Sequence, residues 1–135
     1  MKKILLTLST VLLSYIAFSQ NIEIKNNFIL IEGKECLKIN DSDPNNISIL
    51  DLGGNEIIFL KFIHNSKYGR VYNKITFLDQ KLTFTSKSYI FSKKLLIKKL
   101  LSDNTLENCK LTPEKVEKFV LKYDENVEVD SYRLH

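Results

Sequence analysis

Short apolar runs separated by turn-forming residues are the feature that most constrains the fold of this chain. The runs are rich in Ile, Val, Phe and Thr, and they fill residues 22–91. Such runs are typical of β-strands, and the short intervals between them are typical of hairpins. The pattern therefore predicts an antiparallel meander of about six strands, over residues 28–32, 35–39, 47–52, 56–63, 71–77 and 82–85.

The intervals between these runs carry residues that favour turns for steric reasons. The pair Gly33–Lys34 separates the first two runs, and glycine readily adopts the positive φ that a tight turn needs. The Gly-Gly-Asn segment at residues 53–55 marks a second hairpin. Residues 40–46 concentrate Asn, Asp, Ser and Pro, which predicts a loop.

The hydrophobic pattern also indicates which strands are covered. Residues 56–63 are apolar on both faces apart from Lys61, as expected for a central strand that is covered on both sides. Residues 71–77 and 82–85 alternate apolar and polar side chains, so each of these strands is expected to have one face in water.

Two helices are expected after residue 91, where the hydrophobic period changes. Ser92 can cap the first helix, in which Leu96 and Leu100 form an apolar stripe. Thr112 precedes Pro113 at the start of the second helix, a position where proline is favoured. We therefore expect an α+β fold in which two C-terminal helices pack on one face of the meander. A partly closed β-barrel with a terminal helix is the alternative, and the polar tail from residue 125 is expected to fray.

The first nineteen residues have the pattern of a secretory signal peptide. Lys2 and Lys3 form a charged start, an apolar stretch follows to Phe18, and Ala17 and Ser19 are the small residues for cleavage after residue 19. Ser and Thr interrupt the stretch, and a membrane span needs ~20 consecutive apolar residues. We expect an exported protein, periplasmic or extracellular, with no transmembrane segment in its mature chain. An uncleaved anchor is the alternative.

The mature chain, residues 20–135, has the length of a single domain. It contains two cysteines, Cys36 and Cys109, which export would bring into an oxidising compartment. A disulfide between them is one expectation, and two separate buried thiols are the other. By the loop-entropy argument, a bridge that closes so long a loop stabilises the fold by roughly 4 kcal/mol.

Positive charge is concentrated in the middle of the chain. Residues 57–102 carry ten Lys and Arg against a single acid, Asp79, whereas residues 20–56 and 103–135 have net charges of −4 and −3. Together the three segments leave the mature chain at only +2. Either the segments fold against one another so that opposite charges meet, or the basic block forms a face that attracts an anionic polymer or lipid headgroups.

Candidate partner-binding residues lie in two basic stretches. The first is the sequence HNSKYGR at residues 64–70, expected as a loop between two strands. Loops often carry function, and Tyr and Arg are favoured at interfaces, although a plain polar connection is the alternative. The second is the lysine set of the first expected helix, whose clustering on one face would favour an anionic surface as partner. The candidates are His64, Lys67, Tyr68, Arg70, Lys93, Lys94, Lys98 and Lys99.

Motifs for catalysis or metal binding are weak in this chain. Asp41, Asp43 and Asn45 copy the opening of a calcium loop, but Asn46 and Leu52 stand where its Gly and its closing Glu belong. The sequence has no CxxC, HExxH or GxSxG motif and no glycine-rich phosphate loop. We therefore expect no metal and no cofactor, and we assign no catalytic residues.

These observations favour a small binding or accessory protein over an enzyme. The export signal and the frequent Lys, Asn, Ile and Phe are similar to those of small exported proteins of Gram-negative bacteria. We expect a non-enzymatic protein whose partner is another protein of the bacterial cell envelope. A small secreted hydrolase with a site assembled from distant residues is one alternative, and a binder of anionic surfaces is another.

Overall fold

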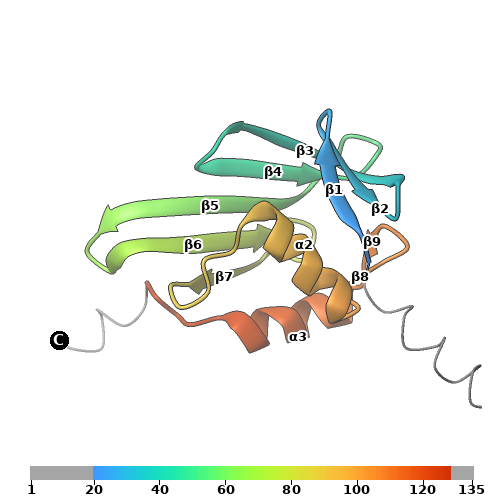
Figure 1. Ribbon diagram of the computed structural model, residues 1–135. Helices are drawn as coiled ribbons and strands as arrows, with labels where there is room; N and C mark the ends of the chain where they lie inside the picture. The colour runs from blue at the N-terminus through green and yellow to red at the C-terminus, as the bar shows by residue number, and fades with distance from the viewer. Residues whose placement is uncertain (1–19, 129–135) are drawn as a thin grey trace, which may run out of the picture.

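Seven antiparallel strands form one sheet and follow one another in chain order in the computed structural model, which describes residues 20–128 (Figure 1). Two helices and a two-stranded ribbon come after the sheet. The predicted α+β meander is therefore confirmed. The elements are β1 (Ile22–Lys25), β2 (Phe28–Ile31), β3 (Lys34–Asp43), β4 (Asn46–Leu50), β5 (Glu56–Ser66), β6 (Gly69–Phe77), β7 (Leu82–Ser86), α2 (Lys93–Ser102), β8 (Leu106–Glu107), β9 (Lys110–Leu111) and α3 (Pro113–Tyr123).

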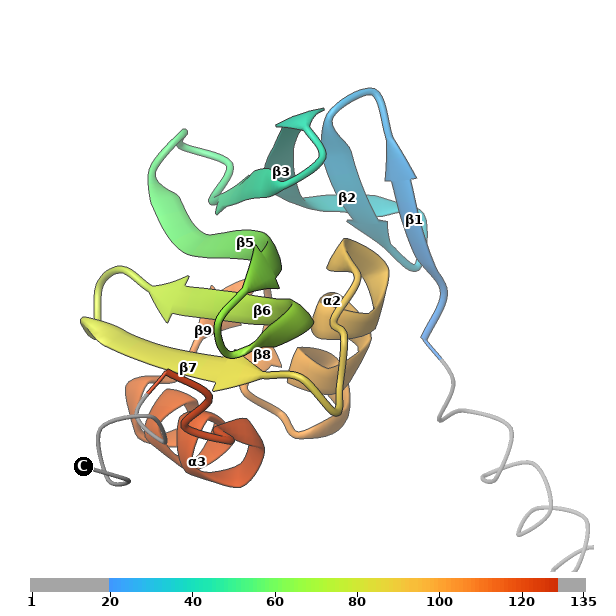
Figure 2. The same ribbon diagram turned by 90° about the vertical axis from the view of Figure 1, so that its left-hand side faces the viewer.

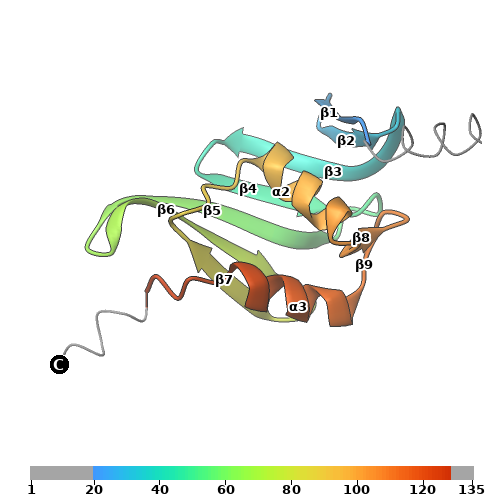
Figure 3. The same ribbon diagram turned by 60° about the horizontal axis from the view of Figure 1, so that its bottom comes forward.

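The sheet is strongly bent, but it stays open. Figure 2 shows β1, β2 and β3 curling over one side of α2 while β6 and β7 pass on the other side. β1 and β7 are the two edges and do not pair with each other, so the barrel alternative is wrong. Both helices lie on the same face of the sheet (Figure 3), which we call the concave face.

One hydrophobic core joins the concave face of the sheet to both helices. Phe119 of α3 lies edge-on to Phe77 and Phe84, with ring centroids 6.0 and 5.8 Å apart, a geometry that aromatic pairs favour. Leu96 and Leu100 form the buried stripe of α2, as their spacing predicts. The fully buried sheet residues of this core are Ile29, Leu37, Ile49, Ile58, Leu60, Ile75 and Phe77.

The helices begin where the sequence predicts. The hydroxyl of Ser92 accepts a hydrogen bond from the backbone N–H of Leu95 at 3.1 Å, which caps α2. Thr112 stands before Pro113 at the start of α3, but its side chain makes no capping hydrogen bond. The Thr112 carbonyl instead accepts from the N–H groups of Lys115 and Val116, both at 3.0 Å.

Two of the predicted turns differ from those in the structure. The first hairpin turns at Glu32 and Gly33, both with positive φ, so the predicted Gly33–Lys34 turn is wrong by one residue. Residues 40–46 are not a loop, because β3 and β4 continue to within two residues of each other. The Asp43 carboxylate accepts a hydrogen bond from the backbone N–H of Asn45 at 2.9 Å, which closes a tight turn. The polar residues on either side of this turn therefore pair as strands, Asn40 with Ser48 and Asp43 with Asn46.

The sheet also has one strand more than expected, because residues 22–25 form β1. β5 is an interior strand, as predicted, but it is not covered on both sides along its length. Ile58 and Leu60 are buried on the concave face, whereas Phe59 and Ile63 on the other face are only half-buried. We call this second face, which carries no helix, the outer face.

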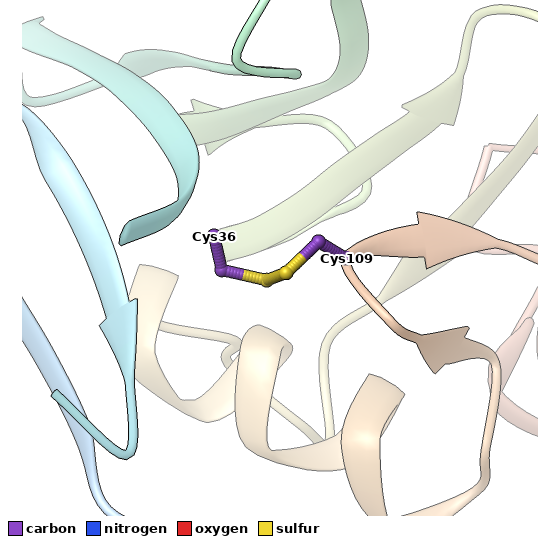
Figure 4. The surroundings of a disulfide bond; sticks show 2 residues. All are labelled: Cys36 and Cys109. Atoms are coloured by element: carbon purple, nitrogen blue, oxygen red, sulfur yellow. A yellow bond between two sulfur atoms is a disulfide. The ribbon is translucent and has the colours of Figure 1, made fainter. Parts of the chain in front are cut away.

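A disulfide links the two halves of the fold. Cys36 of β3 and Cys109, in the turn between β8 and β9, lie with their Sγ atoms 2.11 Å apart and their Cα atoms 5.2 Å apart (Figure 4). The chain has two cysteines, and the structure brings them to bonding distance. This agrees with the expected disulfide and not with two separate buried thiols. The bridge ties the start of β3 to the ribbon that precedes α3.

Residues 124–128, which we call the C-terminal strap, dock on the edge of β7. The backbone N–H of Glu125 donates to the Thr85 carbonyl at 2.8 Å, and the Thr85 N–H donates to the Asp124 carboxylate at 3.1 Å. The N–H of Val127 donates to the Thr85 hydroxyl at 2.8 Å, and the Val127 side chain is buried. The prediction that the chain frays from residue 125 is therefore wrong for residues 125–128, because an edge strand offers unpaired backbone groups that these residues satisfy.

The predicted signal peptide, residues 1–19, lies outside the described residues. Within residues 20–128, neither helix has the length and apolar character that a membrane crossing requires.

Candidate interaction surface

The hairpin of β5 and β6 is the longest in the fold, and its turn extends beyond the other elements (Figures 1 and 3). Residues 64–70 are not the loop that the sequence predicts. β5 continues to Ser66 and β6 begins at Gly69, which pair with each other, so only Lys67 and Tyr68 form the turn. A two-residue turn holds its side chains far more rigidly than a seven-residue loop would.

Four contacts order this turn. The Ser66 hydroxyl accepts from the N–H of Tyr68 at 3.1 Å and donates to the Gly69 carbonyl at 3.4 Å. The Tyr68 ring meets Tyr72 edge-on, with ring centroids 6.2 Å apart. The ammonium of Lys67 lies 5.2 Å from the centre of the Tyr68 ring, within the range of a cation–π contact. The side chains of the turn are therefore held by contacts within the hairpin itself.

The structure brings the four candidates of residues 64–70 together at this tip. His64, Lys67 and Arg70 are exposed, and Tyr68 is half-buried. The imidazole Nε2 of His64 lies 2.9 Å from the side-chain oxygen of Asn45 in the neighbouring turn. The tip thus presents cationic and aromatic side chains without an acidic residue between positions 64 and 70.

The four candidate lysines of α2 do not form one cluster. Lys93 pairs with Asp41 of β3, and Lys99 lies over the ring of Tyr89, 5.6 Å from its centre. The other two, Lys94 and Lys98, are exposed. Two of the four lysines thus have contacts within the protein, and the other two, four residues apart on one face of α2, form an exposed pair.

The outer face of the hairpin carries a carboxylate that the sequence does not reveal as part of a site. Glu128, at the end of the C-terminal strap, accepts a hydrogen bond from the Tyr72 hydroxyl at 2.6 Å and pairs with the Lys74 ammonium at 2.9 Å. Lys61 lies directly opposite Lys74 in the strand pairing. We call the outward residues in the half of this hairpin nearer the turn the hairpin face; they are Lys61, Ile63, Tyr68, Arg70, Tyr72 and Lys74.

The surroundings shift the pKa values of both partners in the Tyr72–Glu128 contact. Burial, together with the hydrogen bond and the negative charge of Glu128, raises the pKa of Tyr72 to about 12. Burial would also raise the pKa of Glu128, but hydrogen bonds from Tyr72 and Lys74 and the charges of Lys74 and Lys61 lower it. At neutral pH the phenol therefore remains a proton donor and the carboxylate remains ionised.

Tyr72 shows where the alternation pattern fails. The sequence places it on a wet face, but only 2% of its surface is exposed. Tyr68 covers it from the turn, and its hydroxyl is bonded to Glu128, a residue 56 positions away in the sequence. No pattern within β6 predicts a cover that comes from the C-terminal end of the chain.

Surface hollows formed by the described residues include the following three. The first, about 470 Å³, lies between the turn of β1 and β2 and the start of α2 and includes the Asp41–Lys93 pair. The second, about 340 Å³, lies beside α3, and the third, about 330 Å³, borders the C-terminal strap next to Lys74 and Glu128. Neither a histidine nor a cysteine lines any of these three hollows within the described chain, and residues 20–128 hold no cluster of three metal-ligating side chains of the His, Cys, Asp and Glu types.

Comparison with known proteins finds no matching family model, no matching curated protein and no matching solved structure. The geometry of the fold and of the hairpin therefore carries the functional argument.

Proposed function

We propose that this protein is an exported, single-domain, non-enzymatic binding module of the bacterial cell envelope, and that it contacts a protein partner through the tip of the β5–β6 hairpin. The observation that carries this proposal is the tip itself. It extends beyond the other elements, it is ordered by contacts within the hairpin, and it presents Tyr68 and Arg70, residue types that often dominate the energy of protein interfaces.

The order of the tip supports binding because association costs conformational entropy. A side chain that is already held in place loses less freedom when a partner covers it. Tyr68 is held by Tyr72 and by the turn hydrogen bonds, and tyrosine has few rotatable bonds to fix.

Export is supported by two independent features. Residues 1–19 have the pattern of a signal peptide, and the cysteines lie at disulfide distance. Disulfides persist in oxidising compartments such as the periplasm and the extracellular medium.

The test is capture of envelope proteins on the affinity-tagged full chain, with a tip variant and a matched control. The tip variant is Tyr68→Ser with Arg70→Ala, and the control is Lys118→Ala, which removes one positive charge from an exposed position of α3. We expect a defined protein that is retained at high salt by the wild type and by the control, and lost by the tip variant. Equal capture by all three proteins would overturn the proposal.

A further inference from the structure

The hairpin face already holds one carboxylate, that of Glu128. Both of its oxygens are bound, one by the Tyr72 hydroxyl at 2.6 Å and the other by the Lys74 ammonium at 2.9 Å. A hydroxyl and an ammonium at these distances form a charge-assisted site that fits a carboxylate. The strap therefore shows which chemical group this face accepts.

More positive charge lies on the hairpin than one carboxylate neutralises. Lys61 stands opposite Lys74, and Arg70 follows the same outward alternation two residues before Tyr72. In the described chain Arg70 forms no ion pair, and Glu128 is the only acid that the hairpin face binds. Lys61, Arg70 and Lys74 thus lie along a face on which the described residues place a single carboxylate.

The attachment of Glu128 is open to competition. About 31% of its side chain and 39% of that of Lys74 remain exposed, so water and other solutes reach the pair. The hollow of about 330 Å³ borders the same two residues and gives a second carboxylate room to approach. A partly exposed ion pair stabilises little, and a partner carboxylate that replaces Glu128 also accepts the hydrogen bond from Tyr72.

We propose that the hairpin face binds an acidic segment of a protein partner, and that Glu128 occupies one of its carboxylate positions in the free protein. One partner carboxylate replaces Glu128 between Tyr72 and Lys74, and another pairs with Arg70. This inference rests on the proposed function and adds the chemistry of the partner. A carboxylate is favoured over other anions because a carboxylate is the group that the face holds in the structure.

The probe is a fluorescent decaglutamate peptide, and the measurement is its fluorescence anisotropy with the full chain at low salt. Glu128→Gln removes the internal competitor, and the same substitution at Glu117, an exposed residue of α3, changes the net charge equally. We expect Glu128→Gln to tighten binding about fivefold, the equivalent of losing a competing contact of about 1 kcal/mol. Glu117→Gln is expected to leave the affinity within a factor of two or so, because its charge is distant from the hairpin.

Removal of a cation tests the other half of the site. We expect Arg70→Ala to weaken binding about tenfold, as the loss of a charge-assisted contact does, and the charge-matched Lys118→Ala, at an exposed position of α3, to leave it nearly unchanged. Equal losses in the two variants would overturn the inference, because they would show attraction to net charge alone. Equal gains in Glu128→Gln and Glu117→Gln would overturn it for the same reason.

Two further probes separate peptide recognition from general anion binding. An oligonucleotide of the same charge and vesicles with anionic headgroups are expected to bind more weakly than decaglutamate. Tighter binding of either would overturn the carboxylate assignment. The two proposals can fail separately. If decaglutamate does not bind but the tip variant still loses its captured envelope partner, this inference falls and the proposed function stands. If the tip variant keeps that partner, the proposed function falls.

Discussion

The side-chain amide of Asn73 pairs with both backbone groups of Phe91. Its oxygen accepts from the Phe91 N–H at 2.5 Å, and its nitrogen donates to the Phe91 carbonyl at 3.4 Å. Both residues have 0% exposure. The Asn73 side chain thus gives the backbone of Phe91 the two hydrogen bonds that a neighbouring strand would otherwise give. It fixes the segment between β7 and α2 against β6.

Substitution of Asn73 is expected to be costly. Asn73→Ala leaves a buried N–H and a buried carbonyl without partners, so we expect the free energy of unfolding to fall by about 2 to 4 kcal/mol. Denaturant unfolding measures this change. The control is Lys94→Ala, an exposed position where a change within about 0.5 kcal/mol is expected. A loss below about 1 kcal/mol in Asn73→Ala would show that Phe91 does not need the amide.

The disulfide is expected to stabilise the fold through the long segment that it closes. Cys36 and Cys109 are 73 positions apart, and the loop-entropy argument gives a stabilisation of roughly 4 kcal/mol. We expect the variant with both cysteines changed to alanine to lose about that much free energy of unfolding. Protein that is unfolded without reductant is expected to contain no free thiol. Two free thiols per chain would mean that the bridge does not form.

The strap should make stability depend on pH through Glu125. Burial would raise its pKa, but hydrogen bonds from Ser86, Lys87 and Ser88 lower it from 4.5 to about 2. Because the pKa is lower in the folded protein, the stabilisation is complete above about pH 4.5 and is lost as the pH falls to about 2.

Glu125→Gln tests this expectation, since glutamine does not ionise. The variant is expected to melt at a lower temperature than the wild type at pH 6, and the difference should shrink as the pH falls toward 2. Glu117→Gln, at an exposed position of α3, is the control. A difference between wild type and Glu125→Gln that is independent of pH would contradict the assigned hydrogen bonds.

Removal of the strap should expose the edge of β7. The backbone N–H and carbonyl of Thr85 face the strap, and a chain that ends at Tyr123 leaves both unpaired. Unpaired strand edges associate with other chains, so we expect this truncation to self-associate in sedimentation experiments while the full chain does not. A chain that ends at Glu128 keeps the strap and is the matched control. Identical behaviour of the two truncations would mean that the strap does not protect the edge.

Local signals predict much of this fold. The sequence predicts hairpins at Gly33 and at residues 53–55, and helix starts at Ser92 and Thr112, because glycine and capping residues act on the backbone beside them. The same reasoning overestimates the loops. Asn, Asp and Ser near a turn read as loop residues, yet only Pro44 and Asn45 leave the strands in the segment 40–46.

The features that the sequence does not reveal depend on distant contacts. Glu128 reaches Tyr72 and Lys74 only because α3 brings the strap back to the edge of β7, and no local pattern encodes that path. The candidate tip was recognised by composition, through Tyr68 and Arg70. The sequence does not reveal that this segment is a two-residue turn between paired strands. A polar segment of seven residues has the composition of a loop, and only the strand pairing shows otherwise.

The central claim is that the hairpin tip is the surface where a protein partner binds. The most direct test is a photo-crosslinking amino acid at position 68, in the tip, and at position 98, on the exposed side of α2, in the full chain expressed in cells of its own organism. We predict a defined crosslinked protein from position 68 and none from position 98. A crosslink from position 98 without one from position 68 would contradict the claim.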